Sequence, residues 1–525
     1  MEFFERFFSH LFDLGVTQAV VCPGARNSYL LRCIEKLGNF RIFFHAEERS
    51  ASFFSLGQNQ AYQGLSSLVL VTSGTAVSEC YSAVIEAHYQ KLPLLVISAD
   101  RPKGWGYTGA PQTIFQRFIF GEYAKYGELD YDRPLSDSEL ANFINQMRDV
   151  RGPLHINCYL PDPRGRRHDI VWNKKGLATS SALASFESPS SPCPRKPLII
   201  VGPITHDHDK AVVETWFNQF DSQLDGYPIV VEASSNLPER RRCFFVNKWL
   251  KRWVDEIEPD GIIKIGGTPL SDIWRDLEDQ EIGVWNFSST GYPGMARSSA
   301  FIGGIGDLFL FSWDFAPMAK RDWMGWEQRA QEQFEFLMRR YPNAEWSWVR
   351  RISESIDDCY LYLGNSLPIR EFDWISYRAK PKRVWSYRGV NGIDGQLSGF
   401  WGWASGLPPQ SDAVAVVGDL TAFYDLQSLW LFHRQPQLFS DKNLVMIILN
   451  NQGGHIFRSY LQYERLVNDH SLNFQSWAEM FQIDYQQWRH FKDFALPRKG
   501  LHVIEIFPDL KEQIAMEKEW SLWRE

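Results

Sequence analysis

The chain has 525 residues, of which 44% are hydrophobic and 22% charged, and a formal net charge of -8. This length predicts two to four domains at roughly 100–200 residues each, and the composition excludes disordered and fibrous classes. The acidic balance and the lack of a Lys/Arg stripe argue against nucleic acid or an anionic membrane as the main partner. Any anion that the protein binds must therefore be held by local groups.

The N-terminal segment and the cysteines indicate the compartment. Apolar residues at positions 3, 4, 7, 8, 11 and 12 have the spacing of a helix face and not that of a signal peptide. No apolar run approaches the ~18 residues that a membrane span needs. The seven cysteines form no CxxC pair, and their odd number suits a reducing compartment. We expect a cytoplasmic protein without a membrane span, a disulfide framework or structural zinc.

Short apolar runs that end in turns and precede helical patterns recur along the chain. Such alternation is typical of parallel sheets that are buried on both faces. The expected strands lie, in chain order, within 19–24, 68–74, 94–100, 198–202, 229–231, 262–266, 360–364, 414–418, 444–449 and 502–506. The sequence predicts an α/β fold of three consecutive parallel-sheet modules, at 1–175, 197–335 and 336–525. The Ser-, Ala- and Pro-rich segment 176–196 has no periodicity and is interpreted as a linker.

Polar motifs follow two consecutive strands of the third module. Gly418 and Asp419 follow one strand, and Asn450, Asn451 and Gly453 follow the next. Ligands of parallel α/β folds bind beyond the carboxyl ends of the strands. A carboxylate, a carboxamide and a backbone carbonyl supply the oxygens that Mg²⁺ prefers, and a diphosphate completes the octahedron. Turn chemistry explains either motif alone, but together they indicate a metal-diphosphate site.

This pair of motifs resembles the metal motif of the thiamine-diphosphate-dependent enzymes, although Leu420 replaces the usual Gly and the spacing is longer, with the excess at 433–442. Other segments resemble one branch, the family of 2-succinyl-5-enolpyruvyl-6-hydroxy-3-cyclohexene-1-carboxylate synthases of menaquinone biosynthesis. They are PGARNS at 23–28, HAEERS at 45–50, TSGTA at 72–76, SADRP at 98–102, GNSLPIR at 364–370 and YRGVNGIDG at 387–395. The resemblance covers the first and third modules well and the middle module poorly.

The resemblance implies an enzyme, a thiamine-diphosphate- and Mg²⁺- (or Mn²⁺-) dependent transferase. It decarboxylates 2-oxoglutarate and adds the succinyl carbanion equivalent to isochorismate, which gives the product in the family name. The first module would bind the aminopyrimidine, the third would bind the diphosphate through the metal, and the middle module has no assigned role. Because family members combine these modules from different subunits, we expect a homodimer or a dimer of dimers.

Glu48 is the predicted catalytic residue. Activation of the cofactor needs a carboxylate against N1′ of the aminopyrimidine, and burial should raise the pKa of that carboxylate. Without the other motifs, Glu48 would be interpreted as a solvated helix start. The resemblance further gives Ile393 as the apolar support of the bent cofactor. The expected cofactor-binding residues are Glu48, Gly74, Thr75, Ile393, Gly418, Asp419 and Asn451, and the expected metal ligands are Asp419, Asn451 and the Gly453 carbonyl.

Two anionic substrates require fixed cations, and Arg suits carboxylates because its planar fork grips two oxygens. By resemblance, Ser366, Arg370 and Arg388 bind 2-oxoglutarate. The remaining substrate residues are Arg26, Arg101 and Gln112 for isochorismate, with Ile456 and Phe457 as an apolar wall. Three positions depart from the family pattern: Ala25 replaces Ser, Pro111 replaces Asn, and Asp272 falls near a Lys.

Three alternatives stay open from the sequence. The altered acceptor residues are compatible with a related carboligase that uses 2-oxoglutarate and a different acceptor. A non-catalytic paralogue would fold and assemble without turnover, although the presence of Glu48, Asp419 and Asn451 argues against it. The glycine cluster at 303–307 faintly suggests a nicotinamide or flavin oxidoreductase, but it lacks the third spaced Gly and the acidic ribose ligand, so it is interpreted as a turn.

Overall fold

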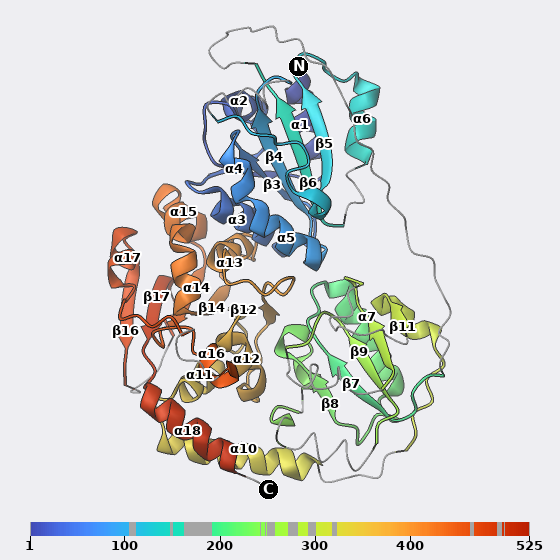
Figure 1. Cartoon of the computed structure of the whole chain (residues 1–525), viewed down its shortest axis with the longest axis vertical. Helices are drawn as coiled ribbons and strands as arrows, with labels where there is room; N and C mark the ends of the chain where they lie inside the picture. Colours follow the sequence, from blue (N-terminus) through green and yellow to red (C-terminus); the bar gives the residue numbers. More distant parts are fainter. Residues whose placement is uncertain are drawn as a thin grey trace. The chain divides into compact units, whose positions relative to one another are not determined.

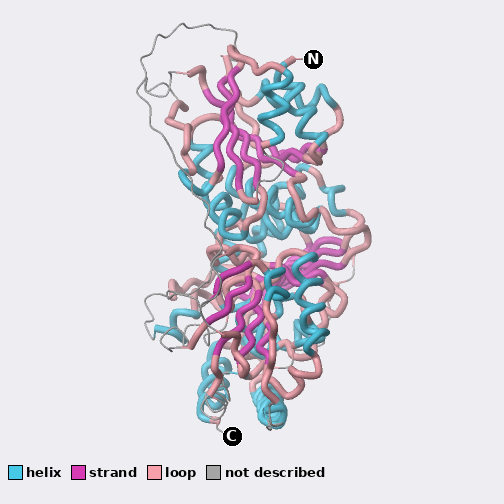
Figure 2. Tube along the Cα trace, turned by 90° about the vertical axis from the view of Figure 1, so that its right-hand side faces the viewer, coloured by secondary structure: helices cyan, strands magenta, loops and turns pink. Residues whose placement is uncertain are grey.

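A computed structural model gives the fold as three parallel β-sheets flanked by helices (Figure 1). The strands of each sheet run side by side, with helices around them (Figure 2). The structure describes residues 2–103, 112–146, 151–161, 192–241, 243–246, 248, 258–270, 282–291, 301–317, 323–461, 467–490, 496–497 and 499–523. The prediction of three parallel-sheet α/β modules is confirmed.

The first sheet, sheet A, has six parallel strands in the order β2-β1-β3-β4-β6-β5. Its strands are β1 (Gln18–Val21), β2 (Arg41–Phe44), β3 (Ser67–Val71), β4 (Leu94–Asp100), β5 (Lys125–Asp130) and β6 (Pro153–Tyr159). The helices along this part of the chain are α1 (Phe3–Asp13), α2 (Ser28–Leu37), α3 (Glu48–Ala61), α4 (Thr75–Glu79), α5 (Tyr81–Gln90) and α6 (Asp137–Asn145). Every residue of β3 and β4 is buried, as their continuous apolar runs predict.

The N-terminal helix confirms the predicted apolar face. Phe4, Phe7, Phe8 and Leu11 of α1 are fully buried in the core of sheet A. The four side chains recur at the spacing that places them on one side of a 3.6-residue helix. Burying such a face stabilises the helix against the sheet.

The middle sheet, sheet B, has five parallel strands in the order β11-β10-β9-β7-β8. The elements are β7 (Pro197–Val201), α7 (Asp207–Phe220), β8 (Ile229–Val231), β9 (Gly261–Ile265), β10 (Val284–Phe287) and β11 (Phe301–Gly303). The glycine cluster at 303–307 ends β11 and begins a 3-10 helix (Ile305–Leu310), where the backbone N–H of Gly304 donates to Asp307 at 2.8 Å. It therefore forms a capped turn, as interpreted from the sequence.

The third sheet, sheet C, has six parallel strands in the order β13-β12-β14-β15-β17-β16. Its strands are β12 (Tyr360–Leu363), β13 (Arg383–Trp385), β14 (Asp412–Gly418), β15 (Asn443–Leu449), β16 (Asp484–Trp488) and β17 (Gly500–Ile506). The helices are α10 (Trp323–Arg340), α11 (Glu345–Glu354), α12 (Leu367–Ile375), α13 (Gln396–Ser405), α14 (Asp419–Tyr424), α15 (Trp430–Arg434), α16 (Ile456–Leu461), α17 (Gln475–Met480) and α18 (Leu510–Leu522). The long helices α10 and α18 lie side by side and are joined by an Arg340–Glu519 ion pair (Figure 1).

The described residues fall into two compact units. One comprises described residues within 1–186, 392–409 and 423–441, and therefore contains sheet A with α13 and α15. The other comprises those within 187–391, 410–422 and 442–525, and contains sheets B and C. The module boundaries at 175 and 335 stay a prediction, and most of the expected linker 176–196 lies outside the described residues.

Helices α3 and α13 pack at backbone contact. A Cβ at Gly57 of α3 would overlap the carbonyl oxygen of Gly399, and one at Gly402 of α13 would overlap the carbonyl oxygen of Phe54. These two glycines allow the helices to approach where any side chain would force them apart. The contact fixes α3, the helix that begins at Glu48, against α13.

Candidate active site

Asp419 lies directly after β14 and begins α14, and its side chain is buried. Its Oδ1 accepts a hydrogen bond from the backbone N–H of Leu420 at 2.6 Å, and its Oδ2 accepts one from Gly453 N–H at 2.9 Å. The ring Nε2 of His470 lies 3.2 Å from the same Oδ2. Burial raises the pKa of Asp419, and these contacts oppose the rise. The carboxylate is thus held in one place by groups that favour its ionised form.

Asn451 follows the adjacent strand, because Gly418 of β14 pairs with Leu449 of β15. Its amide Nδ2 donates to both carboxylate oxygens of Glu345, at 3.1 and 2.9 Å. Its amide Oδ1 is buried and has no hydrogen-bond partner in the structure. An unpaired buried oxygen costs free energy unless a ligand satisfies it.

The donor set fits a hard divalent cation. A buried carboxylate and a buried amide oxygen without a partner lie at neighbouring strand ends, and both are ligands of the type that Mg²⁺ takes. The carbonyl of Gly453 accepts from His455 N–H at 3.0 Å, which leaves one of its two lone pairs. Among the described residues no cluster of three or more His, Cys, Asp or Glu is arranged to hold a metal. The oxygen donors at this edge are a carboxylate, an amide and a backbone carbonyl.

Glu345 is a part of this edge that the sequence did not reveal. It is the first residue of α11, is 4% exposed, and its pKa is raised to about 7, chiefly by burial. The hydrogen bond from Asn451 lowers this pKa, and the negative charge of Asp419 raises it. Glu345 stands 106 residues before Asn451, so no local motif links the two.

The predicted donor-binding residues meet around Asn365, which follows β12. The buried Asn365 donates from Nδ2 to the carbonyl of Tyr387 and accepts from Nη1 of Arg388, each at 2.8 Å. Nη1 of Arg370 donates to the carbonyl of Ser366 at 2.7 Å, and its Nε is buried without a hydrogen-bond partner. The half-buried guanidinium groups of Arg370 in α12 and Arg388 after β13 are thereby fixed to the segment that follows β12.

The expected apolar wall begins α16. Ile456 is half-buried, whereas Phe457 is 42% exposed. A large exposed aromatic ring directly after the Asn451–Gly453 loop is available to an apolar ligand surface. The position of Gly418, the last residue of β14, is open, since a Cβ there would meet nothing within 4 Å.

In the other unit, Glu48 begins α3 and is half-buried. Burial raises its pKa, its own backbone N–H lowers the pKa, and the nearby charges of Glu47 and Glu79 raise it further. Glu47 caps the helix by accepting from the backbone N–H groups of Arg49 and Ser50 at 3.0 and 2.9 Å. The direction of this pKa shift agrees with the one that the sequence predicts, and the catalytic role of Glu48 stays a prediction.

A buried carboxylate, Asp425, fixes the start of α3 to α13. It accepts from the Ser50 hydroxyl at 2.8 Å, and from the backbone N–H and hydroxyl of Ser398 at 2.7 and 2.9 Å. Burial raises the pKa of Asp425, and these donors oppose it. Ile393, half-buried, lies in the loop that leads into α13. The sequence offered no signal for Asp425.

Gly74 adopts a φ of +90°, a conformation that favours glycine, directly before α4. Its N–H donates to Oε1 of the buried Gln116 at 2.9 Å. A Cβ at Gly74 would lie 3.3 Å from the Cα of Gln112, so the predicted cofactor loop touches this predicted acceptor residue. Thr75 begins α4 and is exposed, as is Gln112.

Arg26 and Arg101 follow β1 and β4 of the same sheet. Arg26 is 8% exposed, and its Nη1 donates to the carbonyl of Pro161 at 2.8 Å. Between the two lies Asp100, whose carboxylate accepts from Arg101 N–H at 2.7 Å and from Asn157 at 2.8 Å. Burial raises the pKa of Asp100 to about 6, and the charges of Arg26 and Arg101 oppose the rise.

The altered acceptor positions are described only in part. Ala25 is exposed, and its carbonyl accepts from the Ser28 hydroxyl at 2.8 Å. Pro111 and Asp272 lie outside the described residues.

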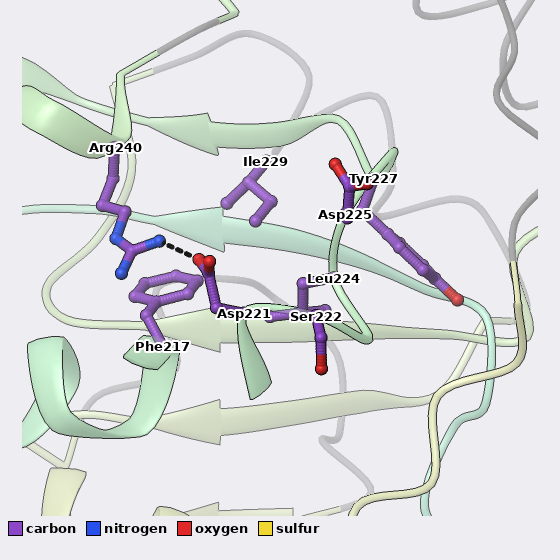
Figure 3. Close-up of a pocket in the computed structure, with 8 residues that line it drawn as sticks. All are labelled: Phe217, Asp221, Ser222, Leu224, Asp225, Tyr227, Ile229 and Arg240. Carbon is purple, nitrogen blue, oxygen red and sulfur yellow. Dashed lines mark hydrogen bonds and ion pairs between the residues drawn. The ribbon is translucent and has the colours of Figure 1, made fainter. Parts of the chain in front are cut away.

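A pocket of about 370 Å³ lies in the middle module. It is lined by Phe217, Asp221, Ser222, Leu224, Asp225, Tyr227, Ile229 and Arg240. Figure 3 shows the side chains of Arg240 and Asp221 directed toward each other beside the ring of Phe217, and the two are 2.6 Å apart. The one arginine that lines this pocket, Arg240, forms an ion pair with Asp221. None of the residues predicted for catalysis or binding lines the pocket.

Comparison with known proteins defines the class. Residues 1–118 match the family model of the thiamine pyrophosphate enzyme N-terminal, TPP-binding domain. The solved structure of benzoylformate decarboxylase from Polynucleobacter necessarius shares the fold over 97% of this chain and 99% of that chain, with a TM-score of 0.65 at 14% identity. The matched domain indicates a thiamine-diphosphate-dependent enzyme, and the solved structure supports the three-sheet fold alone.

Curated relatives narrow the class to one family. The 2-succinyl-5-enolpyruvyl-6-hydroxy-3-cyclohexene-1-carboxylate synthase of Bdellovibrio bacteriovorus is 32% identical over 100% of this chain and 99% of its own length. Those of Akkermansia muciniphila and Bacillus velezensis are 32% and 28% identical, over 95% and 97% of this chain and 94% and 97% of theirs. The chain belongs to the 2-succinyl-5-enolpyruvyl-6-hydroxy-3-cyclohexene-1-carboxylate synthase family.

Proposed function

We propose that this chain decarboxylates 2-oxoglutarate and adds the resulting succinyl carbanion equivalent to isochorismate, in menaquinone biosynthesis. The observation that carries the proposal is the unpartnered, buried amide oxygen of Asn451 at the strand end beside Asp419, in a chain that belongs to the family. Bound thiamine diphosphate would supply the nucleophilic carbon and hold the electron pair left by the departing carbon dioxide. The chain's own residues bind, orient and handle protons.

Asp419, Asn451 and the carbonyl of Gly453 are assigned to Mg²⁺ or Mn²⁺, which would anchor the diphosphate. Glu48 is assigned to the ring nitrogen of the aminopyrimidine, where a carboxyl group of raised pKa exchanges a proton. The loop at Gly74 and Thr75, the side chain of Ile393 and the open backbone at Gly418 complete the cofactor contacts.

The donor pocket is assigned to Ser366, Arg370 and Arg388. Two guanidinium groups fixed by hydrogen bonds to the segment after β12 suit the distal carboxylate of 2-oxoglutarate, since each charge-assisted hydrogen bond contributes roughly 1.5–3 kcal/mol. Ile456 and Phe457 are assigned to the apolar wall. Together these groups distinguish a dicarboxylic 2-oxoacid from an apolar one.

The acceptor pocket is assigned to Arg26, Arg101 and Gln112. Asp100 accepts a hydrogen bond from the backbone N–H of Arg101 and lies near the charges of Arg26 and Arg101. It therefore belongs to the same edge of sheet A, where the second anionic substrate would bind. The contact between Gly74 and Gln112 joins this pocket to the cofactor loop. The exposed Ala25 supplies no hydroxyl where the family pattern has Ser, so the acceptor contacts differ in detail.

We further propose a cytoplasmic homodimer or dimer of dimers. The support is the family resemblance, in which the pyrimidine-binding module (1–175) and the diphosphate-binding module (336–525) of different subunits combine. No helix in the described part of the chain is long and apolar enough to span a membrane. Size-exclusion chromatography with light scattering would give the mass, and a monomer that turns over at full rate would contradict the assembly.

The test of function is a product assay with thiamine diphosphate, Mg²⁺ and 2-oxoglutarate, with and without isochorismate. We expect loss of isochorismate and a product of the mass of the succinyl adduct. Succinic semialdehyde without an adduct would contradict the acceptor and favour the related carboligase. A chain that binds no thiamine diphosphate in calorimetry with Mg²⁺ would contradict the proposal as a whole and favour the non-catalytic paralogue.

A further inference from the structure

We infer that Glu345 is a positioning residue that orients the amide of Asn451 so that its oxygen is presented to the divalent cation. The inference rests on the proposed cation site and adds to it a residue from a different part of the chain. Glu345 is 4% exposed, and both of its carboxylate oxygens accept from the Asn451 amide nitrogen, at 3.1 and 2.9 Å.

The chemistry of the two side chains makes the contact directional. An asparagine amide presents an oxygen at one end and an NH₂ group at the other, and rotation by 180° exchanges them. Both oxygens of the Glu345 carboxylate accept from this NH₂ group, so the carboxylate pairs with the NH₂ end and not with the oxygen end. With NH₂ held by Glu345, the oxygen must point the other way, where it is buried without a partner. Without Glu345, the rotated amide would turn NH₂ toward the cation and lose a ligand.

The position of Glu345 in the fold keeps the carboxylate in place. It begins α11, where a negative charge is stabilised by the helix dipole. The next residues anchor the same helix end: the N–H of Trp346 donates to Gln513 at 3.1 Å. Partners of this kind around ligating side chains change metal affinity by 10–100-fold when they are mutated.

A simple charge effect is the competing explanation, because any carboxylate near a cation attracts it. Two variants separate the explanations. Glu345→Gln removes the charge and allows either end of the Asn451 amide to pair, whereas Glu345→Asp keeps the charge and withdraws it by one methylene from the amide. A positioning role predicts weaker cation binding in both variants, but a charge role predicts it only in Glu345→Gln.

The experiment measures Mn²⁺ affinity in the presence of thiamine diphosphate by electron paramagnetic resonance of free Mn²⁺. We expect both variants to bind Mn²⁺ at least about 10-fold more weakly than the wild type. In an Asn451→Asp background, position 451 has no amide to orient and its carboxylate repels Glu345. There, adding Glu345→Gln should leave Mn²⁺ affinity unchanged or raise it. Equal weakening in both backgrounds, or wild-type affinity in Glu345→Asp, would overturn the inference.

Glu512→Gln is the matched control. Glu512 accepts from the side-chain amide of Asn343 at 3.0 Å, so it is the same kind of contact in the same unit. We expect it to keep wild-type Mn²⁺ affinity, and melting curves of the metal-free variants would show that both are folded. Asp419→Ala distinguishes a failure of the proposed cation site from a failure of the role of Glu345 alone. If Asp419→Ala keeps its Mn²⁺ affinity, the cation site itself is misplaced; if it loses Mn²⁺ while the Glu345 variants do not, only the role of Glu345 fails.

Discussion

Sheets A and C have the same strand order, with the second, first, third, fourth, sixth and fifth strands of each set side by side. Equivalent loops nevertheless carry different chemistry. The loop after the third strand holds Gly74 in sheet A and Asp419 in sheet C, and the loop after the fourth strand holds Arg101 in one and Asn451 in the other. The repeated sheet provides equivalent positions at the carboxyl edge, and the residues in the loops decide what each position binds.

Two acidic residues show this difference most clearly. Glu48 and Asp419 each begin a helix near the carboxyl end of a strand, and burial raises the pKa of both. Asp419 accepts from two backbone N–H groups, which fix its oxygens as a metal ligand requires. Glu48 instead has the acids Glu47 and Glu79 nearby, which favour its protonated form. We therefore propose that the hydrogen bonds suit Asp419 to metal binding, whereas the acidic surroundings suit Glu48 to proton transfer.

The largest effect is expected for Glu48→Gln. The amide cannot exchange a proton, so turnover should fall by roughly 10²–10⁴-fold, the usual contribution of a general acid–base. A steady-state product assay would measure it, with Glu79→Gln as a control, since Glu79 is exposed and acts only through its charge. Activity of Glu48→Gln within a factor of two of the wild type would contradict the proposed proton-transfer role of Glu48.

The comparison also depends on the support of Glu48 by α13. Gly57→Ala places a methyl group on the carbonyl oxygen of Gly399, so the two helices must separate. We expect the unfolding free energy of this unit to fall by about 3 kcal/mol, the upper end of the cost of overpacking. Urea unfolding would measure it. Gly64→Ala is the control in the same unit, because a Cβ there meets only the carbonyl oxygen of Tyr62, at 3.9 Å. Equal stability of both variants would mean that the helix contact is looser than described.

Asp100 tests whether burial governs the edge of sheet A as it governs Glu48. Burial raises its pKa from 3.8 to about 6, so its ionisation opposes folding. This cost is absent below pH 3.8 and reaches roughly 3 kcal/mol above pH 6. Asp100→Asn cannot ionise and avoids the cost. Its unfolding free energy minus that of the wild type should rise by roughly 2–3 kcal/mol between pH 4 and 7 in urea unfolding, and a difference that does not change with pH would contradict the shift.

Arg370→Ala tests the donor side of sheet C. Loss of a charge-assisted contact worth roughly 1.5–3 kcal/mol should raise the apparent KM for 2-oxoglutarate by about 10- to 100-fold. The KM for isochorismate should change much less. The control is Arg383→Ala. Arg383 begins β13, whereas the predicted donor residue Arg388 follows the end of that strand, and Arg383 forms an ion pair with Asp207 at 3.0 Å. Equal effects of Arg370→Ala on both substrates would show that the pockets are assigned wrongly.

The sequence predicts the strands and the loops better than the contacts between distant segments. Continuous apolar runs predict ten of the strands but miss the buried strands β6 and β10, and the polar motifs that follow two of the predicted strands point to Asp419 and Asn451. Asn365 and Asp100 lie within segments of the family resemblance, after β12 and at the end of β4, and these places are the signal that could have pointed to them. Glu345 and Asp425 carry no such signal in the sequence, because their partners are distant along the chain. Glu345 binds Asn451, 106 positions away, and Asp425 binds Ser398, 27 positions away.

The most direct test of the central claim is a Mn²⁺ titration, with thiamine diphosphate, of wild type, Glu48→Gln and Asp419→Ala in parallel by electron paramagnetic resonance. We expect Glu48→Gln to bind Mn²⁺ with wild-type affinity while it fails to turn over. We expect Asp419→Ala to bind Mn²⁺ at least about 10-fold more weakly, since it loses a charged ligand. Loss of Mn²⁺ affinity in Glu48→Gln, or its retention in Asp419→Ala, would contradict the division of roles between the two carboxylates.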